Sequence, residues 1–182
     1  MKSRFVIGLA SAAVLGLSLG GCGAMGAMGM GGAAMAAMPT SAAQYVPMAA
    51  ASDMYEIQSS QLVMQGGQNA EVRRFAQMMV DHHTRTTATL TAAARAAGMT
   101  PPPPALDARK AEMIRQLQAV SGMERERLYV QQQVMAHEEA FALHSKYAAD
   151  GDRAELRTAA AAAVPIIQQH RTEIRRIQSA MS

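Results

Sequence analysis

Apolar residues recur every three to four positions through most of the chain beyond residue 43, a period typical of amphipathic helices. The pattern predicts four long helices and one shorter one, over residues 44–65, 69–98, 107–120, 122–149 and 152–181. No stretch of these segments alternates apolar and polar residues as a half-buried strand would. The sequence therefore predicts an all-α four-helix bundle with one short extra helix, contained in residues 44–182.

Glycine and proline separate the predicted helices. Gly66 and Gly67 end the first helix and Gly98 ends the second, whereas the prolines of 101–104 form a stiff, non-helical connector. Pro165 falls inside the last helix, where it removes one backbone hydrogen bond and predicts a kink.

Residues that favour helix starts precede three of these helices. Asn69 is a good N-cap for the second long helix. Ser121 with Glu124, and Asp152 with Glu155, match the spacing of a capping box at the starts of the third and fourth long helices. Each of these pairs predicts a side chain that accepts a hydrogen bond from the first turn.

The first 21 residues have the features of a signal peptide for export. Lys2 and Arg4 give a charged start, and residues 5–19 form an apolar run too short to span a bilayer comfortably. The run ends in Leu19-Gly20-Gly21-Cys22, which resembles the lipobox of bacterial lipoproteins. The alternative is an ordinary secretory leader followed by a chance cysteine.

A lipobox implies that Cys22 is lipidated, becomes the first residue of the mature protein and anchors it in a membrane. Gly23 rather than Asp follows the cysteine, a pattern that predicts sorting to the outer membrane. We therefore expect a lipoprotein of the cell envelope that faces the periplasm. Cys22 is the only cysteine, so no intrachain disulfide can form.

Residues 22–43 are rich in Gly, Ala and Met and have no helical period, which predicts a flexible linker between anchor and bundle. Five closely spaced methionines there have thioethers of the kind that suit Cu(I): Met25, Met28, Met30, Met35 and Met38. Because no histidine accompanies them, we favour a spacer without a ligand.

The balance of charge argues against a nucleic acid partner. The formal charge is +3, but Lys2 and Arg4 are two of the 17 basic residues, and their removal with the leader leaves 15 basic residues against 14 acidic ones. There is no basic stripe and no tryptophan, and phenylalanine and tyrosine are few. These features give no support for binding to nucleic acid.

Histidines lie on the apolar stripes of three long helices. His83, His137 and His170 each fall on the stripe of their own helix, and Glu56 lies one residue beyond the stripe of the first helix. These four residues predict a metal site with one ligand from each long helix, for Cu, Zn or Fe. The alternative is a set of structural histidines that hydrogen-bond one another and Glu56, because a buried polar group needs a partner.

Three neighbours of these histidines are candidates to orient a ring by hydrogen bonding, namely Asp81, His82 and Glu173. A di-iron oxidase is disfavoured, because such a site needs Glu-x-x-His on two helices and no Glu lies three residues before any histidine. No Ser-His-Asp or Cys-His arrangement can be argued. We therefore expect a non-catalytic protein.

These residues also carry a resemblance. The order of Tyr55, Glu56, the run from Phe75 to His83, Tyr129, His137, Leu156, Pro165 and His170 resembles the bacterial domain-of-unknown-function 4142 family, over roughly residues 44–180. The resemblance implies a ferritin-like four-helix bundle exported to the envelope, with family positions that match Glu56, His83, His137 and His170. Where the family often has Asp-Asp-His, this chain has Asp81-His82-His83.

The family has no established function, so a second hypothesis stays open. The protein would then be a structural or interaction lipoprotein that contacts envelope protein partners through the polar faces of its helices.

Overall fold

The computed structural model describes residues 38–181, and this part of the chain forms five helices and no strand. The helices are α2 (Ala42–Met64), α3 (Ala70–Ala96), α4 (Ala108–Ala119), α5 (Gly122–Asp150) and α6 (Ala154–Ala180). The predicted all-α architecture is confirmed, and each predicted helix end lies within two residues of the observed one. The predicted signal peptide, Cys22 and most of the predicted linker lie outside the described residues.

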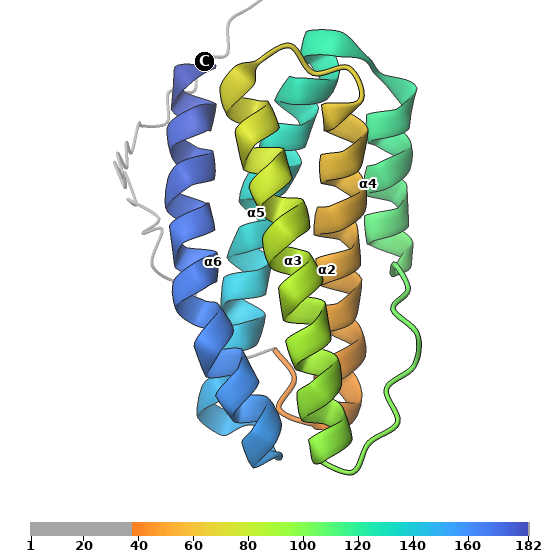
Figure 1. Cartoon of the computed structure of the whole chain (residues 1–182), viewed down its shortest axis with the longest axis vertical. Coiled ribbons are helices and arrows are strands. Elements are labelled where there is room, and N and C mark those ends of the chain that lie inside the picture. Colours follow the sequence, from red (N-terminus) through yellow and green to blue (C-terminus); the bar gives the residue numbers. More distant parts are fainter. Residues whose placement is uncertain (1–37, 182) are drawn as a thin grey trace, which may run out of the picture.

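The four long helices stand side by side as a bundle, and α4 lies outside it (Figure 1). Around the bundle, α2 contacts α3, α3 contacts α6, α6 contacts α5, and α5 contacts α2. The short helix α4 packs on α2 and α5. Pro165 lies inside α6, and Figure 1 shows that α6 bends along its length.

The proline connector runs along the side of the bundle rather than across its end (Figure 1). Pro101–Pro104 line a cavity of about 150 Å³ with Val46 and Ala50 of α2 and Leu90 of α3. The connector thus covers part of the α2–α3 face before the chain turns into α4.

The two largest apolar clusters lie toward the ends of the bundle, and two smaller ones lie between them. One large cluster includes Tyr45, Leu90, Leu143 and Leu156. The other includes Val63, Phe75, Tyr129 and Ile174, near the opposite ends of the same long helices, together with Leu117 of α4. The segments between the clusters carry buried polar side chains, among them Glu56, His83, His137 and His170.

The last residues of the predicted linker already belong to the folded unit. Met38 packs against the apolar cluster that contains Tyr45, and the backbone N–H of Asp152 donates to the carbonyl oxygen of Thr40 at 3.0 Å. Helix α2 accordingly begins at Ala42, two residues earlier than predicted.

Both predicted capping boxes are wrong. Ser121 does occupy the N-cap of α5, but its side chain makes no capping hydrogen bond. The N-cap of α6 is Arg153 rather than Asp152. One oxygen of Asp152 instead accepts from the backbone N–H of Ala42 and from the hydroxyl of Tyr147, each at 2.8 Å. Asp152 therefore ties the start of α2 to the α5–α6 turn.

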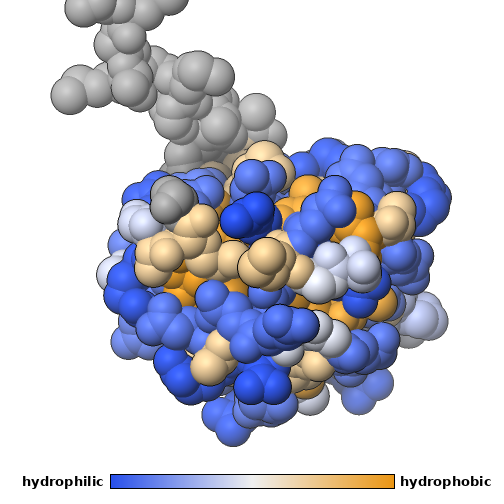
Figure 2. Space-filling view, turned by 90° about the horizontal axis from the view of Figure 1, so that it is seen from above, coloured by the Kyte–Doolittle hydropathy of each residue, from blue (hydrophilic) through white to orange (hydrophobic). Residues whose placement is uncertain are grey.

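None of the helices between residues 38 and 181 has a stretch long and apolar enough to cross a bilayer. Figure 2 views the end of the bundle at which α3 and α5 begin. Hydrophilic residues cover most of this end, and hydrophobic residues form small patches between them (Figure 2).

The N-cap of α3 provides a test of the local structure. The side-chain oxygen of Asn69 accepts from the backbone N–H groups of Glu71 at 2.9 Å and Val72 at 3.2 Å. We expect Asn69→Ala to lower the free energy of unfolding by about 1 kcal/mol, because two N–H groups lose their acceptor. Urea unfolding measures the change. Asn69→Ser keeps an acceptor and should lose much less, and an equal loss in both variants would contradict the capping role.

Candidate metal centre

Three helices bring three imidazoles together in the middle of the bundle. His83 comes from α3, His137 from α5 and His170 from α6, and their exposed fractions are 4%, 0% and 1%. One ring nitrogen of each lies within 4.8 Å of the other two, a spacing that could hold a metal ion. Nε2 of His137 and Nδ1 of His170 are 3.3 Å apart. We call these residues the three-histidine cluster.

The outer nitrogen of each ring contacts a hydrogen-bonding group of the protein. Nδ1 of His83 lies 2.8 Å from Oδ1 of Asp53, and Nδ1 of His137 lies 2.9 Å from the carbonyl oxygen of Gln133. Both oxygens can only accept, so both Nδ1 atoms carry a proton. Nε2 of His170 lies 2.8 Å from Nδ1 of His82. Metal-ligating histidines commonly have such outer partners, which fix the tautomer and the direction of the ring.

Asp53 of α2 is a residue that the sequence analysis missed. Its Oδ1 also accepts from the hydroxyl of Thr86 at 2.8 Å, and its Oδ2 accepts from Thr87 at 3.1 Å. These contacts hold the buried carboxylate against the His83 ring. A usable signal was present, because Asp53 precedes Glu56 by three residues and therefore shares its face of the helix.

Glu56, the predicted fourth ligand, is buried but lies outside the three-histidine cluster. Its Oε1 is 3.8 Å from Nδ1 of His137, the nitrogen that already faces the carbonyl of Gln133. Neither oxygen of Glu56 has a hydrogen-bond partner among the described residues, and Nε2 of His83 also lacks one. The middle of the bundle therefore holds both a carboxylate and an imidazole nitrogen with unmet polar contacts.

Two of the three imidazoles are shifted toward the neutral form. Burial lowers the pKa of His137, and burial together with the neighbouring imidazoles lowers the pKa of His170 to about 2. Burial acts in the same direction on His83, but the hydrogen bond to Asp53 and the charges of Asp53 and Glu56 outweigh it and raise its pKa. In the absence of a metal ion, a proton therefore resides most stably on His83.

Of the three residues predicted to orient a ring, only His82 contacts one. Asp81 is exposed and accepts a hydrogen bond from Gln77. Glu173 pairs with Arg176, one turn further along α6. The prediction for both carboxylates was based on closeness in sequence, but Asp81 points to solvent and an arginine engages Glu173. Asp53 from a different helix takes the role instead.

His144 is a fourth histidine near the core, but it lies outside the three-histidine cluster. Its Nδ1 is 2.9 Å from the hydroxyl of Tyr45, and burial lowers its pKa to about 4. A histidine in the unfolded chain has a pKa of about 6.5. Between these values the unfolded state binds the extra proton, so stability rises with pH.

We expect the metal-free protein to lose stability as the pH falls from about 6.5 to about 4. His144→Gln keeps a hydrogen-bonding group near Tyr45 but does not titrate. The slope of the free energy of unfolding against pH should therefore lose the contribution of up to one proton. Urea unfolding at a series of pH values measures both slopes. An unchanged slope in the variant would contradict the lowered pKa of His144.

Comparisons with known proteins identify a similar fold and a family. A search of curated protein sequences finds no match. The solved structure of CopM in the Cu(II)-bound form is similar, with a TM-score of 0.65 at 12% sequence identity, and the match covers 80% of this chain and 100% of that chain. At this identity the likeness shows the helical-bundle fold alone. The model of the family described as "Domain of unknown function (DUF4142)" matches residues 27–177, which include every helix but the last residues of α6, so the chain belongs to the DUF4142 family.

Proposed function

We propose that this protein binds a transition-metal ion, with copper(II) as the first candidate, through His83, His137 and His170. One observation carries the proposal: three buried imidazole nitrogens, one from each ring, lie within 4.8 Å of one another. Among the described residues, neither Nε2 of His83 nor the buried carboxylate of Glu56 has a hydrogen-bond partner. A cation bound between the rings would give Nε2 of His83 a partner and would balance the charge of Glu56.

The energetics of burial favour this proposal over a purely structural role. A polar group that leaves water without a hydrogen bond costs about 1–3 kcal/mol, and a buried charge without a partner costs more. Structural histidines in a core normally have both ring nitrogens satisfied or one facing solvent. Here Asp53, Gln133 and His82 satisfy the outer nitrogens. The inner nitrogens of His137 and His170 contact each other, but Nε2 of His83 has no partner among the described residues.

The donor set favours copper or zinc. Imidazole suits Cu, Zn, Fe and Ni, and at a given site of nitrogen and oxygen ligands copper(II) binds more tightly than the other divalent metals of the first row. The similar fold of CopM, which has been solved with Cu(II) bound, agrees with copper without showing it for this chain. Glu56 is the buried carboxylate that remains available for a fourth position.

We further propose that the protein holds its metal at the outer membrane, facing the periplasm, as a lipoprotein anchored through Cys22. Residues 22–43 would act mainly as the tether, although their last residues pack on the bundle. A non-catalytic role fits ligands that are almost completely buried, because a substrate needs an open position on the metal. An interaction lipoprotein without a metal is the competing hypothesis, and the next experiment separates the two.

Thermal unfolding of the full chain with and without Cu(II), Zn(II) or Fe(II) tests the site. A ligand at 100 times its dissociation constant stabilises the folded state by about 2.7 kcal/mol. For a chain of this size we expect a rise in Tm of about 5–10 °C with the preferred metal. The combined substitution His83→Ala, His137→Ala and His170→Ala should abolish this rise.

His144→Ala is the matched control, because it removes a histidine of α5 that lies outside the three-histidine cluster. The metal-dependent rise in Tm is compared within each variant, so differences in metal-free stability do not affect the result. No rise in the wild type, or an equal rise in the triple variant, would exclude the site and favour the interaction lipoprotein.

Asp53→Asn tests the outer partner of His83. We expect metal affinity to fall about 10–100-fold, because an amide polarises the imidazole less than a carboxylate does. Competition with a chelator of known affinity measures the dissociation constant. Asp81→Asn removes an exposed carboxylate of α3 and should leave affinity unchanged. An unchanged affinity in Asp53→Asn would show that the carboxylate only supports the fold.

A further inference from the structure

The three-histidine cluster is closed to solvent, so any ion that reaches it has to pass a side chain. The exposed fractions of its three rings do not exceed 4%, and Glu56 is 1% exposed. The apolar clusters at the two ends of the bundle block access along its axis. An ion must therefore pass between two neighbouring helices.

His82 lies between the cluster and the solvent, where α3 faces α6. It is partly exposed, whereas the three rings of the cluster are buried. Its ring stacks on that of His170, with centroids 5.0 Å apart and planes inclined by 25°, and Nδ1 of His82 lies 2.8 Å from Nε2 of His170. Imidazole nitrogens therefore form a continuous series from the surface to the cluster.

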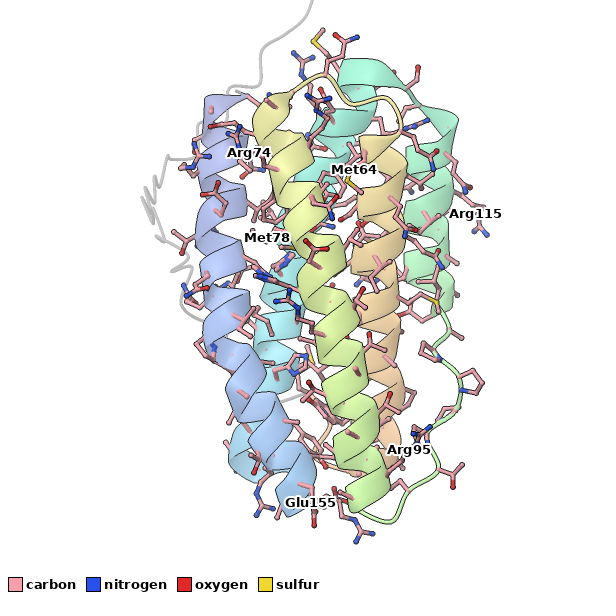
Figure 3. The ribbon with its side chains drawn as sticks, viewed as in Figure 1. Met64, Arg74, Met78, Arg95, Arg115 and Glu155 are labelled. Atoms are coloured by element: carbon pink, nitrogen blue, oxygen red, sulfur yellow. The ribbon has the colours of Figure 1, made fainter. Side chains whose placement is uncertain are left out.

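The surroundings of His82 leave it accessible. Met78 lies one turn earlier on α3, at the side of the bundle shown in Figure 3, and packs against the cluster that contains Ile174 of α6. Asp81 and Thr84, the neighbours on either side of the two adjacent histidines, are exposed. The ring of His82 thus contacts His170 and stays partly open to solvent.

A second route is present but suits a metal ion poorly. A cavity of about 90 Å³ between α2, α3, α5 and α6 reaches Asp53 and is lined by Tyr45, Leu90, His144 and Ile166 among others. The oxygens of Asp53 at its inner end already bind His83, Thr86 and Thr87. An ion that entered there would have to break this set of hydrogen bonds before it reached the cluster.

We propose that His82 is the access residue of the metal site. Building on the proposed metal-binding function, we infer that it takes the ion from solvent through its ring nitrogens and passes it to the three-histidine cluster beside His170. The ring of His82 then returns to its stacked position and closes the site. In this role His82 lowers the barrier to both uptake and release.

Stopped-flow absorbance of the full chain mixed with Cu(II), and release into excess chelator, test the inference. In His82→Ala we expect the rate of uptake to fall about tenfold, because an access residue lowers the barrier to entry. This variant also removes the hydrogen-bond partner of His170, so its dissociation constant should rise as well.

His82→Gln separates access from positioning. Its amide oxygen can still accept a hydrogen bond from Nε2 of His170, but an amide is a poor ligand for Cu(II). We expect uptake and release in His82→Gln to fall by the same factor, about tenfold, with a dissociation constant within about twofold of the wild type. Wild-type rates in His82→Gln would show that His82 acts through the hydrogen bond alone. Faster exchange in His82→Ala would show that the ring of His82 blocks the passage of the ion. Either result overturns the proposal.

Ala162→Leu is the control for the second route, because this exposed residue of α6 lines the cavity that reaches Asp53. Its rates should match those of the wild type, and a slowing confined to this variant would place access there instead. If the wild type binds no Cu(II), the proposed function fails. If it binds Cu(II) but the rates of uptake and release are the same in the His82 variants, only the access role fails.

Discussion

The burial of imidazoles and carboxylates in the middle of the bundle is the constraint on which the rest of the structure depends. His83, His137 and His170 meet between two apolar clusters, where water cannot satisfy them. The protein supplies partners for their outer nitrogens from α2, α3 and α5. It supplies none for Nε2 of His83 or for the carboxylate of Glu56 within the described chain. The outer nitrogens of the three rings therefore have partners, whereas Nε2 of His83 and the Glu56 carboxylate have no hydrogen-bond partner in the described part of the chain.

This polar layer has a structural consequence as well as a chemical one. Each long helix contributes at least one group, so a helix that slipped by one turn would leave several buried groups without partners at once. Buried polar groups can fix register in this way, although they seldom add net stability. The apolar ends, with Tyr45, Phe75, Tyr129 and Ile174 among their members, supply the favourable burial instead. Stability and the candidate site thus occupy different levels of the same four helices.

The sequence was sufficient for the helices but only partly for the site. Glycine, proline and the apolar period act locally, which is why the helix ends were predicted closely. His83, His137 and His170 could be grouped because each falls on an apolar stripe, and stripes face a shared core. Asp53 was missed, and Asp81 and Glu173 were wrongly assigned, because orienting contacts depend on which helices are neighbours. The two capping boxes failed for a similar reason, since tertiary contacts engage Asp152.

The depth of the three-histidine cluster limits the role that the proposed metal site can have. Catalysis needs a ligand position that substrate can reach, and exchange at such a site is fast. Here all three rings are almost completely buried, and the partly exposed ring nearest to them, His82, stacks directly on His170. Because the three rings are closed to solvent, an ion enters and leaves slowly even with His82 as its route. Slow release suits a protein that retains a metal ion. The proposed access role also gives His82 a function that the three-histidine cluster alone does not require.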